Sequence, residues 1–210
     1  MRLHAILVLA VLSGCAGKPL PPDWQSDAKG ALDASVDEYL KGSTAAAQSE
    51  FRDARRATSS TGRADYVVQV ELVRCAAQVA SLDFDDCPGY TALAPEATPA
   101  QRAYADYLYG RWQGLDAALL PEQHRPVLTT GQVAAVEDPL ARLVAAGALF
   151  KAGRMTPQGI ALAIDTASQQ GWRRPLLAWL GVQAQRAEAA GDAQEVQRIR
   201  RRIALVSGQI

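Results

Sequence analysis

Residues 63–82 read RADYVVQVELVRCAAQVASL, and apolar side chains recur along two sides of this segment when it is drawn as a helix. Val67 to Val73 is β-branched and partly alternating, which also permits a strand, but the apolar pattern is too long for one strand. A helix that is apolar on two sides is packed on both, as an internal helix of a helical stack is. The sequence therefore predicts an all-α fold. One apolar stripe consists of Tyr66, Val70, Val73, Ala77 and Ala80, and the other of Val68, Leu72, Cys75, Val79 and Leu82.

Helical periodicity continues on both sides of this segment, and glycine, serine and proline mark the breaks. Thr98-Pro99-Ala100-Gln101 combines an N-cap, a first-turn proline and a capping-box glutamine, so it begins a helix. We expect residues 83–99 to form a loop, 115–120 to form a short helix and 124–131 to be irregular, and Trp24 to dock on the first helix. The other predicted helices are 26–41, 44–58, 98–112, 138–152, 156–171, 174–191 and 193–207.

Two of the predicted turns share an order of residues. Tyr39-Leu40-Lys41-Gly42 precedes Ala47, Phe51 and Ala54, and Phe150-Lys151-Ala152-Gly153 precedes Ile160, Ile164 and Ala167. This order resembles the turn and second helix of tetratricopeptide repeats, which recur at about 34 residues with small residues where the helices meet. The resemblance covers 26–82 and 138–208. It implies stacked antiparallel helical hairpins, a tetratricopeptide-like α-solenoid, within a helical domain over 26–210.

The amino terminus has the order of a secretory signal. A short basic start precedes an apolar run from Ala5 to Leu12, which is too short to span a bilayer. Leu12-Ser13-Gly14-Cys15 then resembles the lipobox of bacterial lipoproteins. The resemblance implies that residues 1–14 are a signal peptide, that Cys15 is lipidated, and that the protein is anchored to a membrane. The alternative is an ordinary signal peptide that contains a cysteine.

The residues after Cys15 suggest a tether and a destination. Residues 15–25 contain several prolines, which favour an extended spacer between the lipid and the helical domain. Ala16, rather than an aspartate, follows the cysteine, and by resemblance to sorted lipoproteins this implies the outer membrane, facing the periplasm. Basic and acidic residues balance at 22 each, so the composition does not favour binding to nucleic acid.

Two cysteines remain after lipidation. In an exported chain Cys75 and Cys87 are expected to form a disulfide, and the alternative is a buried Cys75 beside a free Cys87. One histidine, His124, remains beyond the signal peptide, and no CxxC spacing occurs, so no metal or other cofactor is expected. The sequence contains no GxSxG-type nucleophile elbow that could form a catalytic triad with His124. The acids of 83–86 are not followed by the glycine and the glutamate of a helix-loop-helix calcium site. We therefore expect a protein without enzymatic activity.

Two groups of side chains are candidates for binding a partner. The first is aromatic, and its alternative role is core packing. The second is the basic face of the last helix, and its alternative role is a solvated face on the end helix of the stack. The aromatic group consists of Tyr104, Tyr107 and Trp112 with Arg111, and the basic group of Arg198, Arg201 and Arg202.

These features favour a lipid-anchored periplasmic scaffold that presents a helical groove to partner proteins in envelope biogenesis or secretion. Stacked helical hairpins form such a groove by their geometry. Known tetratricopeptide lipoproteins work in this way, so the resemblance implies the same class of role. The alternative is an envelope protein that binds peptidoglycan or another glycan, or that modifies the cell wall.

Overall fold

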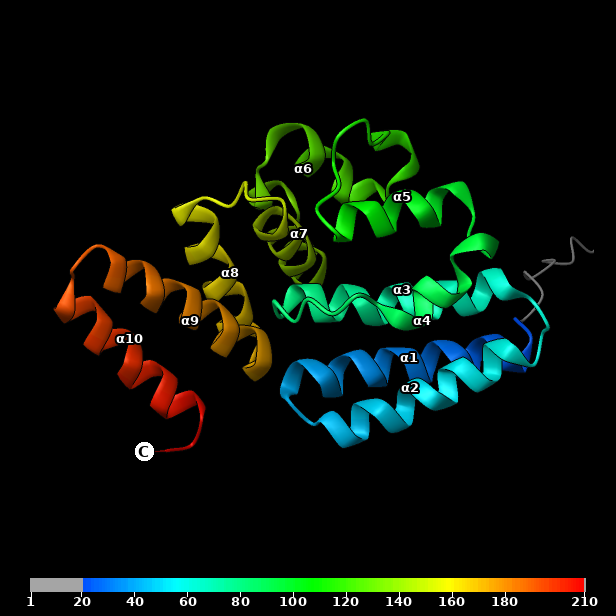
Figure 1. Cartoon of the computed structure of the whole chain (residues 1–210). Coiled ribbons are helices and arrows are strands. Elements are labelled where there is room, and N and C mark those ends of the chain that lie inside the picture. The colour runs from blue at the N-terminus through cyan, green and yellow to red at the C-terminus, as the bar shows by residue number, and fades with distance from the viewer. Residues whose placement is uncertain (1–20, 210) are drawn as a thin grey trace, which may run out of the picture.

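A computed structural model describes residues 21–209, and within that range the chain is entirely helical, with ten α-helices, four 3₁₀ turns and no strand (Figure 1). The predicted all-α class is confirmed. Cys15 and the signal peptide lie outside the described residues. The helices are α1 (Asp23–Lys41), α2 (Thr44–Ser59), α3 (Ala64–Ala80), α4 (Pro88–Leu93), α5 (Pro99–Leu108), α6 (Arg125–Thr130), α7 (Pro139–Lys151), α8 (Pro157–Gln170), α9 (Arg173–Ala189) and α10 (Ala193–Val206). None of these helices is both long and apolar enough to cross a membrane.

Helices α1 and α2 form a hairpin that lies along one side of α3 (Figure 1). The chain reverses at Gly42, whose φ of +96° lies in the left-handed region that favours glycine. The Ser35 hydroxyl donates a hydrogen bond of 2.8 Å to the Ala47 carbonyl, which joins the two helices. Small residues at this contact let the helices approach closely, so the predicted hairpin of 26–41 and 44–58 forms.

Helix α3 is packed on both sides, as its two apolar stripes predict. Val68, Leu72 and Val79 belong to the main core with α5 and α7, whereas Val70 packs against Phe51 of α2. The approach of α7 to α3 is close, because a Cβ on Gly147 would lie 2.0 Å from the Val79 carbonyl oxygen. A glycine is therefore required in the middle of α7.

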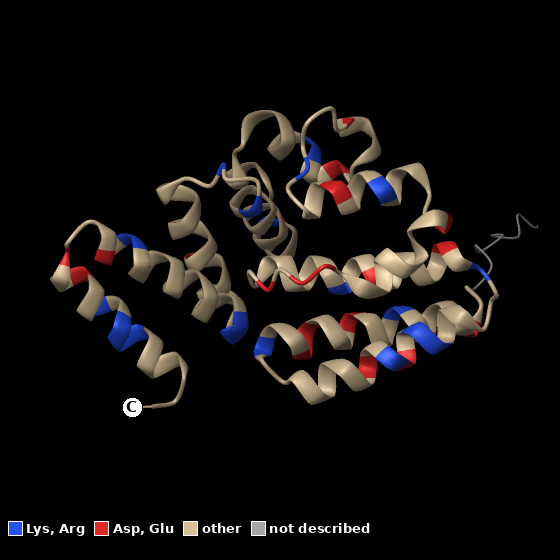
Figure 2. Cartoon of the chain, in the orientation of Figure 1, with Lys and Arg blue, Asp and Glu red and all other residues tan. Residues whose placement is uncertain are grey.

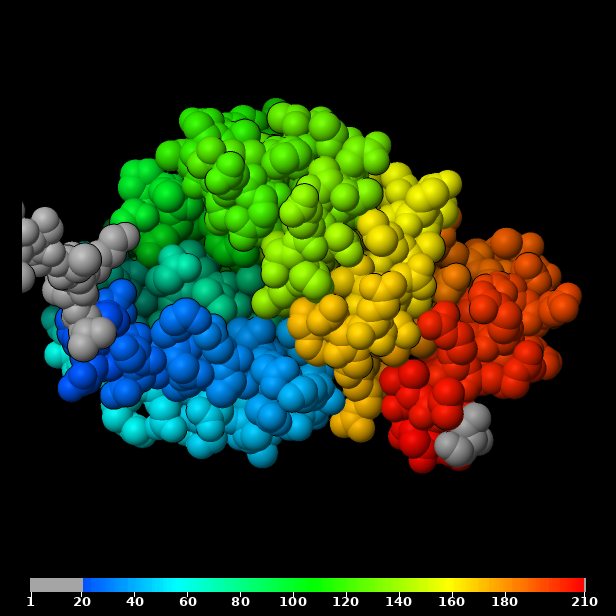
Figure 3. All heavy atoms as spheres, turned by 180° about the vertical axis from the view of Figure 1, so that it is seen from behind, coloured from blue at the N-terminus to red at the C-terminus, as the bar shows by residue number. Residues whose placement is uncertain are grey.

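The carboxyl-terminal helices agree with their predicted bounds to within two residues. Asp138, Thr156 and Asp192 each accept a hydrogen bond from a main-chain N–H of the first turn, so side chains cap α7, α8 and α10. Helix α8 packs on α7 and α9, and α10 packs on α9. In Figure 3 the spheres of α9 meet those of α1, so the first hairpin contacts the carboxyl-terminal helices through α9.

A pair of hydrogen bonds holds α9 to the first hairpin. The Arg174 Nε donates to the Tyr39 carbonyl at 2.7 Å, and its Nη2 donates to the Thr44 hydroxyl at 2.6 Å. The Trp179 indole also donates to the Ala80 carbonyl at 3.1 Å and so joins α9 to the end of α3. These bonds link residues about 100 or more positions apart in sequence.

The middle of the chain differs most from the predictions. Residues 83–99 are not a continuous loop, because Pro88 begins α4 and a 3₁₀ turn follows it at Ala94–Glu96. Residues 124–131 are not irregular, since Pro126 lies in the first turn of α6. The predicted short helix at 115–120 is a 3₁₀ turn at Ala117–Leu119.

Two helix ends also differ from the predictions. Helix α5 stops at Leu108 rather than near Trp112, because Gly110 turns the chain with a φ of +72° against the end of α7. Helix α1 begins at Asp23, so it takes in Trp24 and overlaps the predicted tether. Trp24 packs on Tyr66 of α3, with ring centroids 5.1 Å apart, and not on the first helix as predicted.

Candidate functional site

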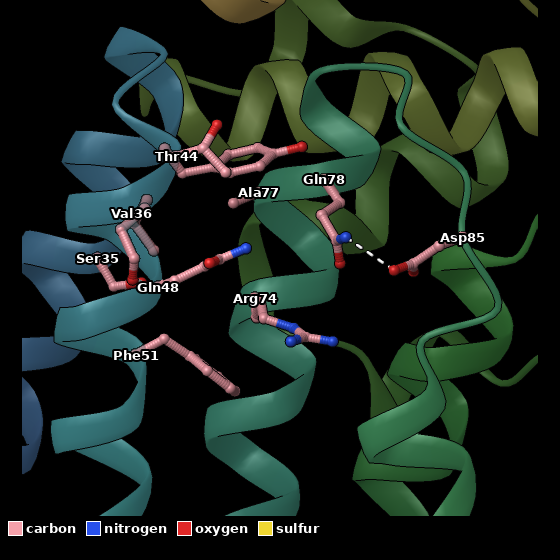
Figure 4. Close-up of a pocket in the computed structure, with 11 residues that line it drawn as sticks. Ser35, Val36, Thr44, Gln48, Phe51, Arg74, Ala77, Gln78 and Asp85 are labelled. Carbon is pink, nitrogen blue, oxygen red and sulfur yellow. Dashed lines mark hydrogen bonds between the residues drawn. The ribbon is translucent and has the colours of Figure 1, made fainter.

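A pocket of about 260 Å³ lies where the α1–α2 hairpin meets α3 and the loop before α4 (Figure 4). The hairpin supplies one wall, α3 the floor, and the loop at Asp85 the opposite edge. One turn of an α-helix, about 5.4 Å high and about 10 Å across, occupies on the order of 400 Å³. The pocket therefore admits a single residue or a small group, and it is smaller than the roughly 300–1,000 Å³ usual for pockets that bind drug-sized molecules.

The hairpin wall of the pocket is apolar. Val36 comes from α1 and Ala47 and Phe51 from α2, and Ala77 of α3 continues the surface. Phe51 is 9% exposed, and Figure 4 shows its side chain extending from α2 toward α3. A side chain that entered the pocket would exchange water for these carbon atoms, which is favourable at about 25 cal/mol per Å² of apolar surface buried.

The floor of the pocket carries a cation, Arg74. Its guanidinium carbon lies 4.7 Å from the centre of the Phe51 ring, which is a cation–π arrangement. Its Nε is 3.9 Å from Oε2 of Glu71, too far for a hydrogen bond, and this nitrogen is buried without an acceptor. Within residues 21–209 the Arg74 guanidinium has no hydrogen bond, although a third of the side chain is exposed.

Glu71 explains why Arg74 is left with spare donors. The Glu71 side chain is 3% exposed, and its Oε1 accepts a 2.8 Å hydrogen bond from Arg55 Nε. A Cβ on Gly89 would collide with this carboxylate, so α4 closes over it. One buried carboxylate thus faces two arginines, Arg55 at hydrogen-bond distance and Arg74 beyond it. The cluster has one more positive than negative charge.

The loop edge of the pocket is held by hydrogen bonds and by a disulfide. Gln78 Nε2 donates to Asp85 Oδ2 at 2.8 Å, and Asp85 Oδ1 accepts from the Cys87 main-chain N–H at 2.9 Å. The Cys75–Cys87 disulfide is present, with the two Cα atoms 5.8 Å apart, so this prediction is confirmed. It ties the loop to α3 and thereby fixes one edge of the pocket.

Tyr39, at the other end of the pocket, forms a hydrogen bond with a second acid of the loop, Asp83. The Tyr39 hydroxyl donates to Asp83 Oδ2 at 2.9 Å. Burial first, and then the negative charge of Asp83, raise the pKa of Tyr39 well above its usual value. Tyr39 is therefore neutral at physiological pH, and its hydroxyl proton is engaged in the hydrogen bond to Asp83.

The predicted aromatic group is mostly core, which corrects part of the binding assignment. Tyr107 is fully buried and so cannot offer its ring to a partner; it stacks on Trp112 at 5.1 Å and lies 5.0 Å from His124. Tyr104 is partly buried and packs on Tyr107 and His124. The Trp112 indole donates to the Tyr107 carbonyl at 2.9 Å. The side chains of Tyr104, Tyr107, Trp112 and His124 are called the aromatic cluster below.

Burial shapes the chemistry of this cluster. His124 is 2% exposed, and desolvation lowers its pKa to about 4, an effect that the negative charge of Asp138 partly opposes. Its Nδ1 and the Tyr107 hydroxyl are buried without hydrogen-bond partners. A neutral, enclosed histidine of this kind serves packing.

Arg111, the charged member of the predicted group, is exposed. It forms an ion pair of 2.6 Å with Asp106, and its guanidinium lies 4.4 Å from the centre of the Tyr109 ring. A groove nearby, between α3 and α5, is lined by Tyr104 and Arg125 among others. Arg125 already donates to the carbonyls of Leu120 and Ala118, so little hydrogen-bonding capacity is left there.

The basic face of α10 is exposed but partly neutralised (Figure 2). Arg198 pairs with Glu195 at 2.5 Å, and Arg200 pairs with Glu188 at 2.8 Å. Arg201 and Arg202 make no ion pair within the part of the chain that the structure describes. The basic face of α10 is thus a weaker candidate for binding than the pocket on α3. This face does not lie near the aromatic cluster, because α10 packs on α9.

The described residues also offer one cluster of metal-ligand types. Cys75, Asp85 and Cys87 bring ligand atoms within 4.8 Å of one another, but the two sulfurs are bonded to each other as a disulfide. A thiolate is what binds a metal, so the oxidised pair does not offer one. The pocket edge at Asp85 is therefore a structural feature rather than a metal centre.

Sequence reasoning missed the pocket, although two of its residues carried a signal. Arg74 and Gln78 stand four positions apart on a helix that is otherwise apolar on two sides. A charge on such a helix must be paired or must face water, so it marks an opening in the packing. The sequence could not predict that Asp85 lines the pocket, because the path of the loop before α4 determines its position.

Comparisons of this chain with protein-family models, with curated proteins and with solved structures find no match. The functional interpretation of the pocket therefore rests on its own geometry.

Proposed function

We propose that this protein is a non-enzymatic, lipid-anchored scaffold of the periplasm that holds a protein partner by a residue inserted between α2 and α3. The observation that carries the proposal is the pocket at Arg74, which combines an apolar wall with a cation that has no hydrogen bond in the described chain. A few aromatic and arginine anchors in well-packed pockets supply most of the energy of protein interfaces. A partner anchored here would use both features.

The helical framework would act as a rigid support for this pocket. We propose that α1, α2, α3, α7, α8, α9 and α10 form one tetratricopeptide-like stack, with residues 81–138 inserted into it. Supporting this proposal, each of these seven helices packs on the next one in that order. The inserted segment supplies the pocket edge at Asp85.

Membrane anchoring at the outer membrane remains a proposal that rests on the lipobox resemblance at Leu12–Cys15. Two or three acyl chains hold a protein on a membrane where one does not. Replacing Cys15→Ser should leave the precursor unprocessed or release the protein from membranes, as fractionation and intact mass would show. Unchanged processing together with unchanged membrane retention would contradict the anchor.

The proposed interaction is tested by site-specific photo-crosslinking in cells. A photoreactive amino acid replaces Gln48, an exposed residue of α2 that lines the pocket, and in a matched strain it replaces Gln185, an exposed glutamine on α9. We expect a discrete protein adduct at Gln48 that is absent at Gln185 and lost in an Arg74→Gln background. Equal adducts at both positions would place the interaction elsewhere on the surface.

The same strains address the alternative of a wall-binding protein. No observation in the described residues favours a glycan over a protein at this pocket, because its volume of about 260 Å³ is small for an oligosaccharide. Co-sedimentation of the purified chain with peptidoglycan, lost on Arg74→Gln, would favour that alternative instead.

A further inference from the structure

We infer that the pocket recognises the carboxyl-terminal residue of a partner polypeptide, with the terminal carboxylate on the Arg74 guanidinium and an apolar last side chain against Phe51. The inference rests on the proposed function and names the anchor that the pocket accepts. It starts from an inventory of the charged and polar groups around the pocket.

Every charged group at the pocket other than Arg74 is engaged within the chain. Asp85 accepts hydrogen bonds from Gln78 and Cys87, and Asp83 accepts one from Tyr39. At the hairpin end, Arg174 donates to the Tyr39 carbonyl and the Thr44 hydroxyl. Among the charged groups, the hydrogen-bonding capacity left over is that of Arg74. Of the neutral groups, Gln78 Oε1 is an acceptor without a donor, so it offers nothing to an incoming carboxylate.

The spare donors of Arg74 select an anion with two oxygens. A guanidinium presents its N–H groups in a planar fork that matches a carboxylate, and such charge-assisted pairs are the strong hydrogen bonds of protein interfaces. The one acid that pairs with Arg74 in the described residues is Glu71, whose Oε2 lies 3.9 Å from Arg74 Nε and whose Oε1 serves Arg55. An incoming carboxylate would complete the pairing that Glu71 leaves open.

The volume of the pocket restricts where that carboxylate can come from. About 260 Å³ admits less than one helical turn, so an occupant that carries the charge and the apolar contact on one residue fits it best. An internal aspartate or glutamate carries its charge at the end of its only side chain and leaves the wall of Val36, Ala47 and Phe51 unfilled. A carboxyl-terminal leucine, valine or alanine carries the carboxylate and an apolar side chain on the same Cα atom.

Position and charge agree with this occupant. In Figure 4 the apolar side chains of Val36 on α1 and Phe51 on α2 stand to one side, and Arg74 and Gln78 stand on α3 to the other. Asp85 lines the loop edge, and acidic residues colour the segment before α4 red in Figure 2, which disfavours a carboxylate there. The terminal carboxylate is thereby directed to Arg74, away from the loop.

The test compares three labelled peptides on the full-length chain purified in detergent. Fluorescein-Gly-Gly-Ala-Leu is prepared with a free carboxylate and with a terminal amide, and a third peptide, amide-terminated fluorescein-Gly-Glu-Ala-Leu, restores the net charge. Fluorescence anisotropy should show the free acid binding at least about tenfold more tightly than either amide, as expected for a lost charge-assisted hydrogen bond.

Two arginine variants sharpen the test. Arg74→Gln should abolish the preference for the free acid, whereas Arg52→Gln, an exposed arginine of α2 outside the pocket, should keep it. If Arg74→Gln does not fold, Arg74→Lys keeps a charge near Glu71 but loses the fork, and the preference should fall by several-fold. Circular dichroism identifies which variants are folded.

Three results would overturn the inference. They are equal binding of acid and amide by the natural chain, a preference that persists in folded Arg74→Gln, and no saturable binding of the free acid up to millimolar concentration. Any of these results together with a retained adduct at Gln48 would reject recognition of a terminal carboxylate and leave the proposed scaffold role in place. Loss of that adduct would instead remove the scaffold role at this pocket.

Discussion

The pocket on α3 and the aromatic cluster beside α5 contain similar chemistry in opposite settings. Each combines aromatic rings with polar atoms that lack a hydrogen bond, Arg74 Nε in the pocket and Tyr107 Oη and His124 Nδ1 in the cluster. Tyr107 is not exposed at all, whereas a third of the Arg74 side chain is. An unused polar atom can serve recognition only where a ligand can reach its side chain, so the pocket is the candidate site and the cluster is core.

The difference arises from what closes each region. Rings fill the space around Tyr107, since Trp112 and His124 lie 5.1 and 5.0 Å from it. At the pocket, small residues such as Ala47 and Ala77 line the junction of the hairpin and α3, where a space of about 260 Å³ remains. Close packing of interiors makes such a space unusual.

The largest effect is expected from truncating the centre of the cluster. Tyr107→Ala removes a fully buried ring and should lower the free energy of unfolding by about 4 kcal/mol. Phe51→Ala, at the pocket wall, should cost roughly half of that because the ring already borders open space. Urea unfolding followed by circular dichroism measures both. Equal costs would show that the pocket wall is packed as tightly as the cluster.

Removing the disulfide should lower the stability of the fold and also loosen the pocket. Cys75→Ala with Cys87→Ala opens a link of sequence separation 12 and should cost about 3 kcal/mol of unfolding free energy. Because the bridge holds the loop at Asp85, binding of the free-acid peptide should also weaken. Urea midpoints and anisotropy measure the two effects. Two free thiols in the non-reduced mass of the exported protein would contradict the bridge itself.

The cluster should also make stability depend on pH. Burial lowers the pKa of His124 to about 4, below its ordinary value near 6.5, so the unfolded chain takes up the proton first as pH falls. The stability is fully present above about pH 6.5 and is lost toward pH 4, by up to about 3 kcal/mol. His124→Phe should flatten this dependence between about pH 6.5 and pH 4.5 in urea titrations.

Arg74→Gln serves as the control for that measurement. Because Arg74 lies on the pocket floor and not in the cluster, the variant should keep the pH dependence of the natural chain. A dependence that disappears in Arg74→Gln but survives in His124→Phe would assign it to the pocket instead.

The smallest effect is expected at Arg111. Its ion pair with Asp106 is exposed, and such pairs contribute little to stability. Arg111→Gln should leave the urea midpoint and the adduct at Gln48 almost unchanged. Loss of that adduct would extend the binding surface to α5 and restore this arginine as a candidate.

The sequence by itself determined the helical class and most helix bounds. The periodicity of residues 63–82, the capping signal at Thr98, and the pair Cys75 and Cys87 all express local or short-range physics. Such signals depend on neighbours within a few turns of helix. They are therefore readable before the fold is known.

Tertiary structure alone decided which side chains are open to a ligand. Tyr107 and Arg74 both lie on predicted helices, yet α7 and the segment around His124 cover the first, while the hairpin stops short of the second. The seam between α2 and α3, the loop that carries Asp85 and the pairing of one Glu71 with two arginines all depend on contacts across elements. Burial is set by what packs on a residue, and no local pattern contains that information.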